Sequence, residues 1–111
     1  LNACTNYPMR DDFSTFIPFR RDMHLPAVVF VKADWCPHCH SMAPHMKRAQ
    51  KMLGNTMPVY VVDADANQNV VQQLGVQGFP TVFVIGADRR KREYDGRREA
   101  KSIAQFARRF V

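Results

Sequence analysis

Trp35-Cys36-Pro37-His38-Cys39-His40 is the stretch that decides the fold, because it separates a strand pattern from a helix pattern. Upstream, the β-branched and aromatic run over residues 27–31 predicts a buried strand. Downstream, residues 40–53 predict a helix that ends at Gly54. The two thiols therefore lie at a strand-to-helix junction, near the positive end of the helix dipole.

This position favours thiol chemistry. Free N–H groups at a helix N-terminus stabilise a thiolate, which is the reactive form of cysteine. Cys36 is expected at the first turn and is the predicted nucleophile, while Cys39, three residues on, is the predicted resolving thiol. An imidazole at His38 would also stabilise the thiolate of Cys36, and so make a disulfide at this site more oxidising.

Three other interpretations fit the same residues. C-x-x-C-H is also the spacing of c-type haem attachment. Cys36, Cys39 and the histidines at 38, 40 and 45 offer zinc ligands, but a structural zinc site normally takes four ligands and only one C-x-x-C is present. The third alternative is a thiol pair without turnover. The alternation of strands and helices favours a redox pair, so we expect no cofactor and no metal, with His40 and His45 on the helix surface.

The rest of the chain predicts an α/β fold. Strand and helix patterns alternate, which implies a parallel crossover, and the last strand pattern follows a short turn, which implies an antiparallel return. The predicted elements are strands 58–62, 81–85 and 90–94, a helix at 67–74 that ends at Gly75, and a final helix after Gly96.

The N-terminal region carries the weakest patterns. Residues 12–17 have apolar side chains at helical spacing, which predicts a short amphipathic helix, and a first strand is weakly indicated within residues 2–8. We expect one domain over residues 1–111, with residues 1–9 as a poorly ordered segment, and a free thiol at Cys4. No signal peptide is visible at the start, which leaves open whether one has been removed.

Charge is concentrated near the C-terminus. The chain has a net charge of +6, and residues 86–111, with nine basic and four acidic side chains, contribute +5 of it. Aromatic side chains do not alternate with these charges, so we interpret them as a solvated edge strand and helix surface and expect no nucleic-acid partner. The sequence contains no run of 18 apolar residues, so no membrane span is predicted. We also expect a monomer.

A second informative stretch is Gly78-Phe79-Pro80-Thr81, at the start of the strand predicted over 81–85. Proline in a sheet belongs at a strand start, an edge or a bulge. If the Phe79–Pro80 bond were cis, the backbone N–H and C=O of Phe79 would face outward, where an extended peptide can bind them.

In combination these motifs resemble the thioredoxin superfamily, most closely a protein disulfide isomerase-type thioredoxin domain. The resemblance covers about residues 10–111 and is carried by motifs in family order. These are Ala33-Asp34-Trp35-Cys36-Pro37-His38-Cys39, Pro44, Val62-Asp63-Ala64, Gly75-Val76-Gln77-Gly78-Phe79-Pro80-Thr81 and Tyr94-Asp95-Gly96-Arg97.

The resemblance implies a thioredoxin fold, with a central mixed β-sheet of four to five strands flanked by helices on both faces. It implies that Pro80 is a cis proline facing the disulfide and that Pro44 kinks the active-site helix. It assigns Trp35, Phe79, Pro80 and Gly96 to substrate binding, and Cys36, Pro37, His38 and Cys39 to catalysis. The Pro37-His38 pair resembles that of DsbA-type oxidants.

The chain departs from this family at one place. The family usually has a buried acid six residues before the first cysteine, paired with a lysine on the next strand. Here those positions hold Phe30 and Val61. We therefore expect Cys39 to lie over an apolar floor that raises its pKa, so that it resolves mixed disulfides slowly unless water or a histidine assists.

The sequence thus predicts a thiol–disulfide oxidoreductase that oxidises or isomerises disulfides of cysteine-containing proteins through a mixed disulfide, and that works with a redox partner protein. The alternatives are a thioredoxin-like reductase and a non-catalytic binding module of the same fold. The Pro37-His38 pair favours an oxidising compartment, which would be the periplasm, the endoplasmic reticulum lumen or the exterior, over the cytoplasm.

Overall fold

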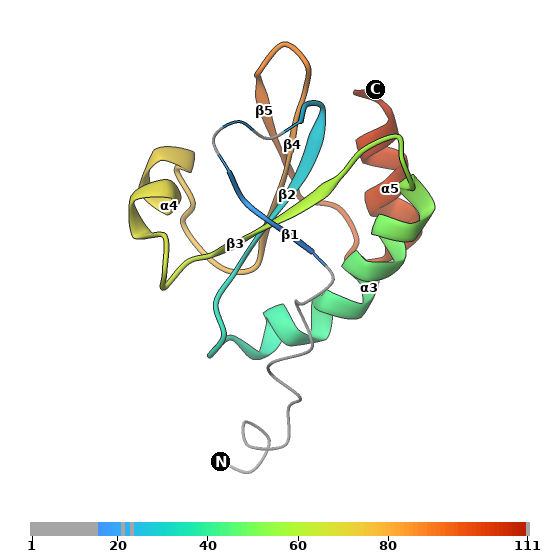
Figure 1. Ribbon diagram of the computed structural model, residues 1–111. Helices are drawn as coiled ribbons and strands as arrows, with labels where there is room; N and C mark the ends of the chain where they lie inside the picture. Colours follow the sequence, from blue (N-terminus) through green and yellow to red (C-terminus); the bar gives the residue numbers. More distant parts are fainter. Residues whose placement is uncertain (1–15, 21, 23, 111) are drawn as a thin grey trace.

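A five-stranded mixed sheet in the order β1-β3-β2-β4-β5 forms the centre of the computed structural model, which describes residues 16–20, 22 and 24–110 (Figure 1). The strands are β1 (Ile17–Pro18), β2 (Ala27–Lys32), β3 (Val59–Asp63), β4 (Thr81–Ile85) and β5 (Lys91–Tyr94). The helices are α3 (Pro37–Leu53), α4 (Gln68–Leu74) and α5 (Ala100–Arg108). Strand β3 runs parallel to β1 and β2, and β4 runs antiparallel to β2 and β5. The predicted α/β fold is confirmed.

The predicted strands and helices from residue 27 onward are also confirmed, with boundaries that agree to within three residues. Two glycines end helices as expected. Gly54 follows α3 with φ of 56°, and Gly75 follows α4 with φ of 71°, a left-handed conformation that a residue with a Cβ adopts only with strain.

The prediction for residues 12–17 is wrong at its C-terminal end. Ile17 and Pro18 form the edge strand β1 instead, opposite Tyr60 and Val61, and the following N–H of Phe19 donates to the Val61 carbonyl at 3.0 Å. Backbone hydrogen bonds to a distant strand outweigh a helical spacing that covers only two turns. The predictions for residues 2–8, for the order of residues 1–9 and for Cys4 lie outside the described residues.

Helices cover both faces of the sheet, as predicted (Figure 1). The side chains of Val28 and Phe30 pack with α3 and α5 in one hydrophobic cluster. Those of Val29 and Val31 point to the opposite face, where they pack with α4 in a second cluster. This alternation along β2 means that the side chains at even positions lie beneath α3, the helix that carries both cysteines.

Phe30 is at the centre of the face beneath α3. It is fully buried, lies opposite Val61 on β3, and contacts Phe16 edge to face with ring centroids 5.6 Å apart. The two positions where the family usually has an acid and a lysine are therefore neighbours in the sheet. In this chain both are filled by apolar side chains, which leaves no buried charge unpaired there.

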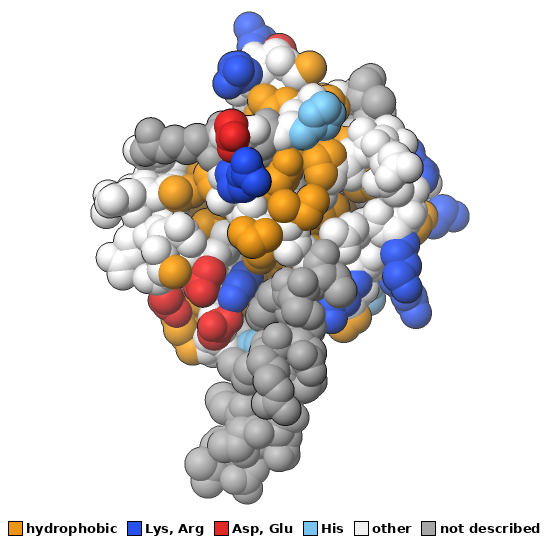
Figure 2. Space-filling view, viewed as in Figure 1, with side chains coloured by type: hydrophobic (Ala, Val, Ile, Leu, Met, Phe, Trp, Pro, Cys, Tyr) orange, Lys and Arg blue, Asp and Glu red, His pale blue; other side chains and the backbone are white. Residues whose placement is uncertain are grey.

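The basic residues near the C-terminus include members of an edge strand of the sheet, as expected from the sequence. Strand β5 is an edge strand, and its Lys91 and Arg92 lie over the rings of Phe83 and Phe110. At the other edge, where Figure 2 shows hydrophobic side chains gathered, Ile17 is 40% exposed. None of the described helices is long and apolar enough to cross a membrane.

Phe30→Ala should lower the free energy of unfolding by about 3–5 kcal/mol, because it removes a fully buried ring and leaves a cavity beneath α3. Denaturant unfolding of the reduced protein measures this loss. Phe30→Leu is the matched control and should lose less than half as much, since it keeps most of the apolar volume. Equal losses in the two variants would contradict this role of the ring.

Candidate active site

Cys36 caps the N-terminus of α3. Its backbone is extended, with φ of −91° and ψ of 111°, and its Sγ accepts a hydrogen bond from the N–H of Cys39 at 3.3 Å. Its carbonyl accepts bonds from the N–H groups of Cys39 and His40 at 3.1 and 3.3 Å. Pro37 follows in the first turn, where a missing N–H is tolerated. The sulfur of Cys36 therefore faces a helix end that favours negative charge.

Cys39 lies below Cys36 and is fully buried. It belongs to the hydrophobic cluster that contains Phe30, and both thiols are free. Burial raises the pKa of Cys39 to about 12, with a further rise from the adjacent Cys36, while the backbone of Ala33 and the positive charge of Lys32 act in the opposite direction. The predicted apolar floor beneath Cys39 and its effect on the pKa are confirmed.

The Phe79–Pro80 peptide bond is cis, and the Phe79 carbonyl faces the first cysteine. The Sγ of Cys36 donates to this carbonyl at 3.8 Å. The Thr81 hydroxyl donates to the Gly78 carbonyl at 2.6 Å and fixes the turn that leads into β4. The two motifs, 43 positions apart in sequence, thus meet at one sulfur. A second cis bond, Leu25–Pro26, was not anticipated from the sequence.

Two aromatic side chains flank this meeting point. Trp35 and Phe79 contact each other edge to face with ring centroids 5.9 Å apart. Trp35 is 63% exposed, and its indole N–H donates to the Asp65 carboxylate at 3.3 Å. Pro37 and His38 are exposed on the first turn of α3. An open, partly apolar surface therefore surrounds the nearly buried sulfur of Cys36.

Gly96 has a packing role in this structure. A Cβ at this position would lie 2.7 Å from the Tyr94 hydroxyl oxygen and 2.8 Å from its ring, and that hydroxyl donates to the Arg97 carbonyl. The absence of a side chain at Gly96 lets the Tyr94 ring close over the chain. Its assignment to substrate binding stays a prediction. Pro44 lies within α3, on its exposed side, and its role in kinking the helix stays a prediction.

The prediction that His40 is a surface residue is wrong, because its side chain is buried and only 4% exposed. Its Nε2 donates to the Asp34 carbonyl at 2.7 Å and so ties the loop before the cysteines to α3. His45 is half-buried. Among the described residues, no group of three or more His, Cys, Asp or Glu side chains could hold a metal ion.

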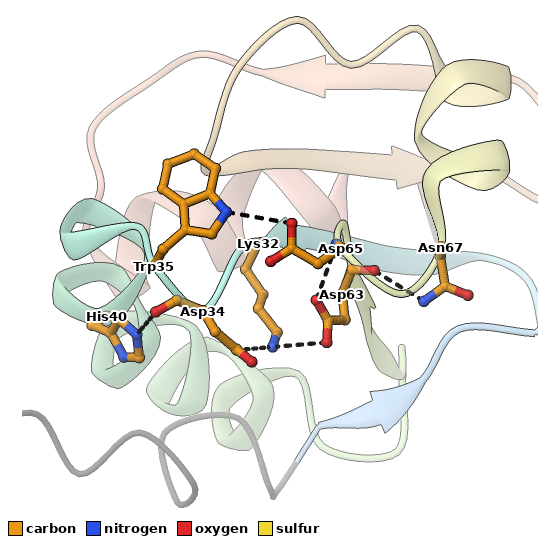
Figure 3. Close-up of polar contacts among 7 residues, drawn as sticks. All are labelled: Lys32, Asp34, Trp35, His40, Asp63, Asp65 and Asn67. Atoms are coloured by element: carbon orange, nitrogen blue, oxygen red, sulfur yellow. Dashed lines mark hydrogen bonds and ion pairs between the residues drawn. The ribbon is translucent and has the colours of Figure 1, made fainter.

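A charged cluster beside the cysteines was missed by the sequence analysis (Figure 3). The Nζ of Lys32 lies 2.5 Å from Asp34 and 3.8 Å from Asp63, although its side chain is only 7% exposed. The Asp63 side chain accepts the N–H of Asp65, which in turn holds Trp35. The signal in the sequence was a lysine at the end of an otherwise apolar strand, with the same parity as Phe30.

The sequence matches the family model described as Thioredoxin over residues 10–109. A protein disulfide-isomerase A6 homolog of Drosophila melanogaster is 42% identical over 81 residues, which cover 72% of this chain and 19% of that protein. Protein disulfide-isomerase like 2-2 of Arabidopsis thaliana is 43% identical over 75 residues, which cover 68% and 17%. The chain thus spans about a fifth of the length of these curated relatives.

Solved structures agree on the fold. The J-Trx1 fragment of ERdj5 superposes with a TM-score of 0.76 at 22% identity, covering 91% of this chain and 54% of that one. The Trx4 domain of ERdj5 superposes with a TM-score of 0.64 at 26% identity, covering 71% and 73%.

The burial of Cys39 should make the stability of the reduced protein fall at alkaline pH. The pKa of a cysteine in an unfolded chain is about 8.5, whereas burial raises the pKa of Cys39 in the folded protein to about 12. Between these values the unfolded chain binds fewer protons than the folded one, so the free energy of unfolding decreases as pH rises. Denaturant unfolding under reducing conditions at several alkaline pH values measures the slope.

Cys39→Ala should flatten this slope, because the buried thiol that resists ionisation is gone. Cys36→Ala is the matched control and should keep most of it, since burial is the main cause of the raised pKa. An equal slope in the wild type and in Cys39→Ala would contradict the burial of an un-ionised thiol.

Proposed function

Because the chain belongs to the thioredoxin family, we propose that it is a thiol–disulfide oxidoreductase that oxidises or isomerises disulfides of protein substrates through Cys36 and Cys39. The observation that carries the proposal is the position of the Cys36 sulfur. It lies at the N-terminus of α3, 3.3 Å from the N–H of Cys39 and 3.8 Å from the carbonyl that precedes cis Pro80. Relatives named protein disulfide-isomerase support the same chemistry.

In oxidation, a substrate thiolate attacks the Cys36 sulfur of the disulfide form. The Cys36–Cys39 bond breaks, a mixed disulfide forms at Cys36, and Cys39 leaves and takes up a proton. A second substrate thiolate attacks the substrate sulfur of the mixed disulfide. The substrate leaves with a new disulfide, and the enzyme leaves with two thiols.

In isomerisation the reduced enzyme acts first. The thiolate of Cys36 attacks a substrate disulfide, and a different substrate thiolate then displaces Cys36. When no such thiolate arrives, Cys39 can attack Cys36 in the mixed disulfide and release the substrate, a step termed escape. Because the raised pKa of Cys39 keeps it protonated near neutrality, this escape is slow, and the mixed disulfide persists long enough to rearrange. Slow escape suits oxidation and isomerisation better than repeated reduction.

The substrate would bind across the surface formed by Trp35, Phe79 and Pro80. Trp35 is exposed and contacts Phe79 edge to face, so it offers apolar area to a peptide side chain. An extended peptide can add hydrogen bonds to the backbone beside the cis proline. Recognition through backbone and one apolar platform is tolerant of sequence, as an enzyme acting on many cysteine-containing proteins requires.

The Pro37-His38 pair supports an oxidising compartment for this activity, and a redox partner protein would restore the disulfide there. His38 is exposed on the first turn of α3, one residue before Cys39 and two after Cys36. A charged or hydrogen-bonding imidazole there stabilises the reduced form, which makes the disulfide a better oxidant.

The equilibrium reduction potential of the Cys36/Cys39 couple should fall between roughly −120 and −200 mV, the range of oxidants and isomerases. Cys36→Ala should abolish reactivation of scrambled ribonuclease, because no nucleophile remains. Cys39→Ala should instead accumulate a mixed disulfide with the substrate, visible by non-reducing electrophoresis. Cys4→Ser, outside the pair, is the matched control and should behave as the wild type.

A potential near about −270 mV would mark the protein as a reductase instead. Unchanged biological function in the double variant Cys36→Ser/Cys39→Ser would favour a binding module.

His38→Ala should make the potential more negative by about 30 mV or more, equivalent to a tenfold change in the equilibrium constant of the two-electron couple. The cause is the loss of an imidazole that stabilises the reduced form. Equilibration with glutathione buffers measures the shift. His45→Ala, two turns further along α3, is the matched control and should leave the potential unchanged; equal shifts in both variants would refute the role of His38.

A further inference from the structure

Lys32 is the one lysine or arginine that is buried among the residues the structure describes. It is the last residue of β2 and follows Val28 and Phe30 on the face beneath α3. Asp63, its partner in the sheet, ends β3 and points to the same face as Val61. A buried lysine paired with a half-buried acid therefore lies one step beyond the apolar Phe30–Val61 pair, at the end of the sheet where α3 begins.

Two acidic side chains flank the ammonium group of Lys32. Its Nζ lies between the carboxylates of Asp34 and Asp63, at 2.5 and 3.8 Å (Figure 3). Both acids reach solvent, since their side chains are 55% and 35% exposed. In the view of Figure 2, acidic side chains gather beside a basic one at the lower left. The backbone is fixed as well, since the Lys32 carbonyl accepts the Ala64 N–H at 2.8 Å.

A positive charge near Cys39 would favour the thiolate form that resolves a mixed disulfide. Cys39 is fully buried on the same face, and burial holds its pKa well above neutrality, so this thiolate is scarce. The charge of Lys32 lowers the pKa of Cys39, and the Lys32 side chain, only 7% exposed, follows Val28 and Phe30 on the face of the sheet that α3 covers. A positive charge in a poorly solvated region acts more strongly than one at the surface.

We propose that Lys32, held by Asp34 and Asp63, is a positioning residue whose charge stabilises the thiolate of Cys39 while it forms or leaves. The proposal rests on the proposed function and deepens it. In resolution, Cys39 loses its proton to water and its thiolate attacks Cys36. The Cys36–substrate bond breaks, the Cys36–Cys39 bond forms, and the substrate leaves as a thiolate. In oxidation the same charge stabilises Cys39 as the leaving group. No further oxidant or reductant is needed.

The acids have the opposite effect on Cys39. Asp63 shields the ammonium, so removing its charge should strengthen the field of Lys32 at the sulfur. A merely structural ion pair predicts something different, because loss of either partner would then disturb the loop and slow resolution alike. The sign of the two effects therefore separates an electrostatic role from a structural one.

The test uses the full chain with Cys4→Ser, reduced and mixed with dithiodipyridine, a neutral disulfide whose approach does not depend on protein charge. The first thiopyridone released reports attack by Cys36. The second, independent of reagent concentration, reports intramolecular attack by Cys39. Both rates are followed from pH 6 to 9, a range chosen to lie below the pKa of Cys39, about 12.

In the wild type the second rate should rise about tenfold per pH unit, without a plateau. Lys32→Met should lower it about tenfold at every pH and leave the first rate unchanged, a change equivalent to one pKa unit at Cys39. Lys32→Arg should restore most of it. Asp63→Asn should raise it. Lys51→Met, which removes an exposed charge at the far end of α3, is the matched control and should change neither rate.

An unchanged second rate in Lys32→Met, or equal slowing in Lys32→Met and Asp63→Asn, would overturn the proposal. If thermal unfolding shows that Lys32→Met does not fold, Asp63→Asn decides alone: a faster second release supports the proposal, and an unchanged or slower one overturns it. Failure of the proposed function looks different, because the two releases would then occur normally while no protein substrate is oxidised or isomerised.

Discussion

The packing of α3 across one face of the sheet determines the chemistry of the two thiols. The side chains of Val28 and Phe30 make that face apolar, and α3 packs on it so closely that Cys39 has no surface exposed to solvent. Cys36, at the N-terminal end of the same helix, accepts the N–H of Cys39 at its sulfur. One contact between a helix and a sheet thus gives two cysteines, three residues apart, opposite electrostatic surroundings.

This asymmetry assigns the two thiols different roles. The sulfur of Cys36, which accepts a hydrogen bond at a helix N-terminus, is suited to act as the nucleophile. The sulfur of Cys39, whose pKa is raised, stays protonated and reacts more slowly. The apolar Phe30–Val61 pair strengthens the difference, because it places nothing charged directly beneath Cys39. Lys32, one step along the same strand, acts against this difference, because its positive charge lowers the pKa of Cys39.

The chain spans only about a fifth of its curated relatives, so the relatives inform the chemistry of this domain more than the biology of a whole protein. What the domain itself offers a substrate is local. It consists of an exposed Trp35 in edge-to-face contact with Phe79, the carbonyl before cis Pro80, and the sulfur of Cys36. Asp65, through its bond to Trp35, couples this surface to the charged cluster.

The sequence by itself determined the strands and helices from residue 27 onward and the junction that holds Cys36, because hydrophobic period, helix-ending glycines and the spacing of two thiols are local properties. The apolar floor beneath Cys39 and a cis Pro80 facing the cysteines were expected only through the resemblance to the thioredoxin superfamily. The sequence patterns failed at Ile17, which pairs with β3, and at His40, which is buried against the Asp34 carbonyl, because their partners are distant in sequence or in a loop. Only the tertiary structure brought Phe79 to Cys36 and Asp63 to Lys32. Such contacts depend on the register between strands and on the packing of α3, and neither is written in any short stretch of residues.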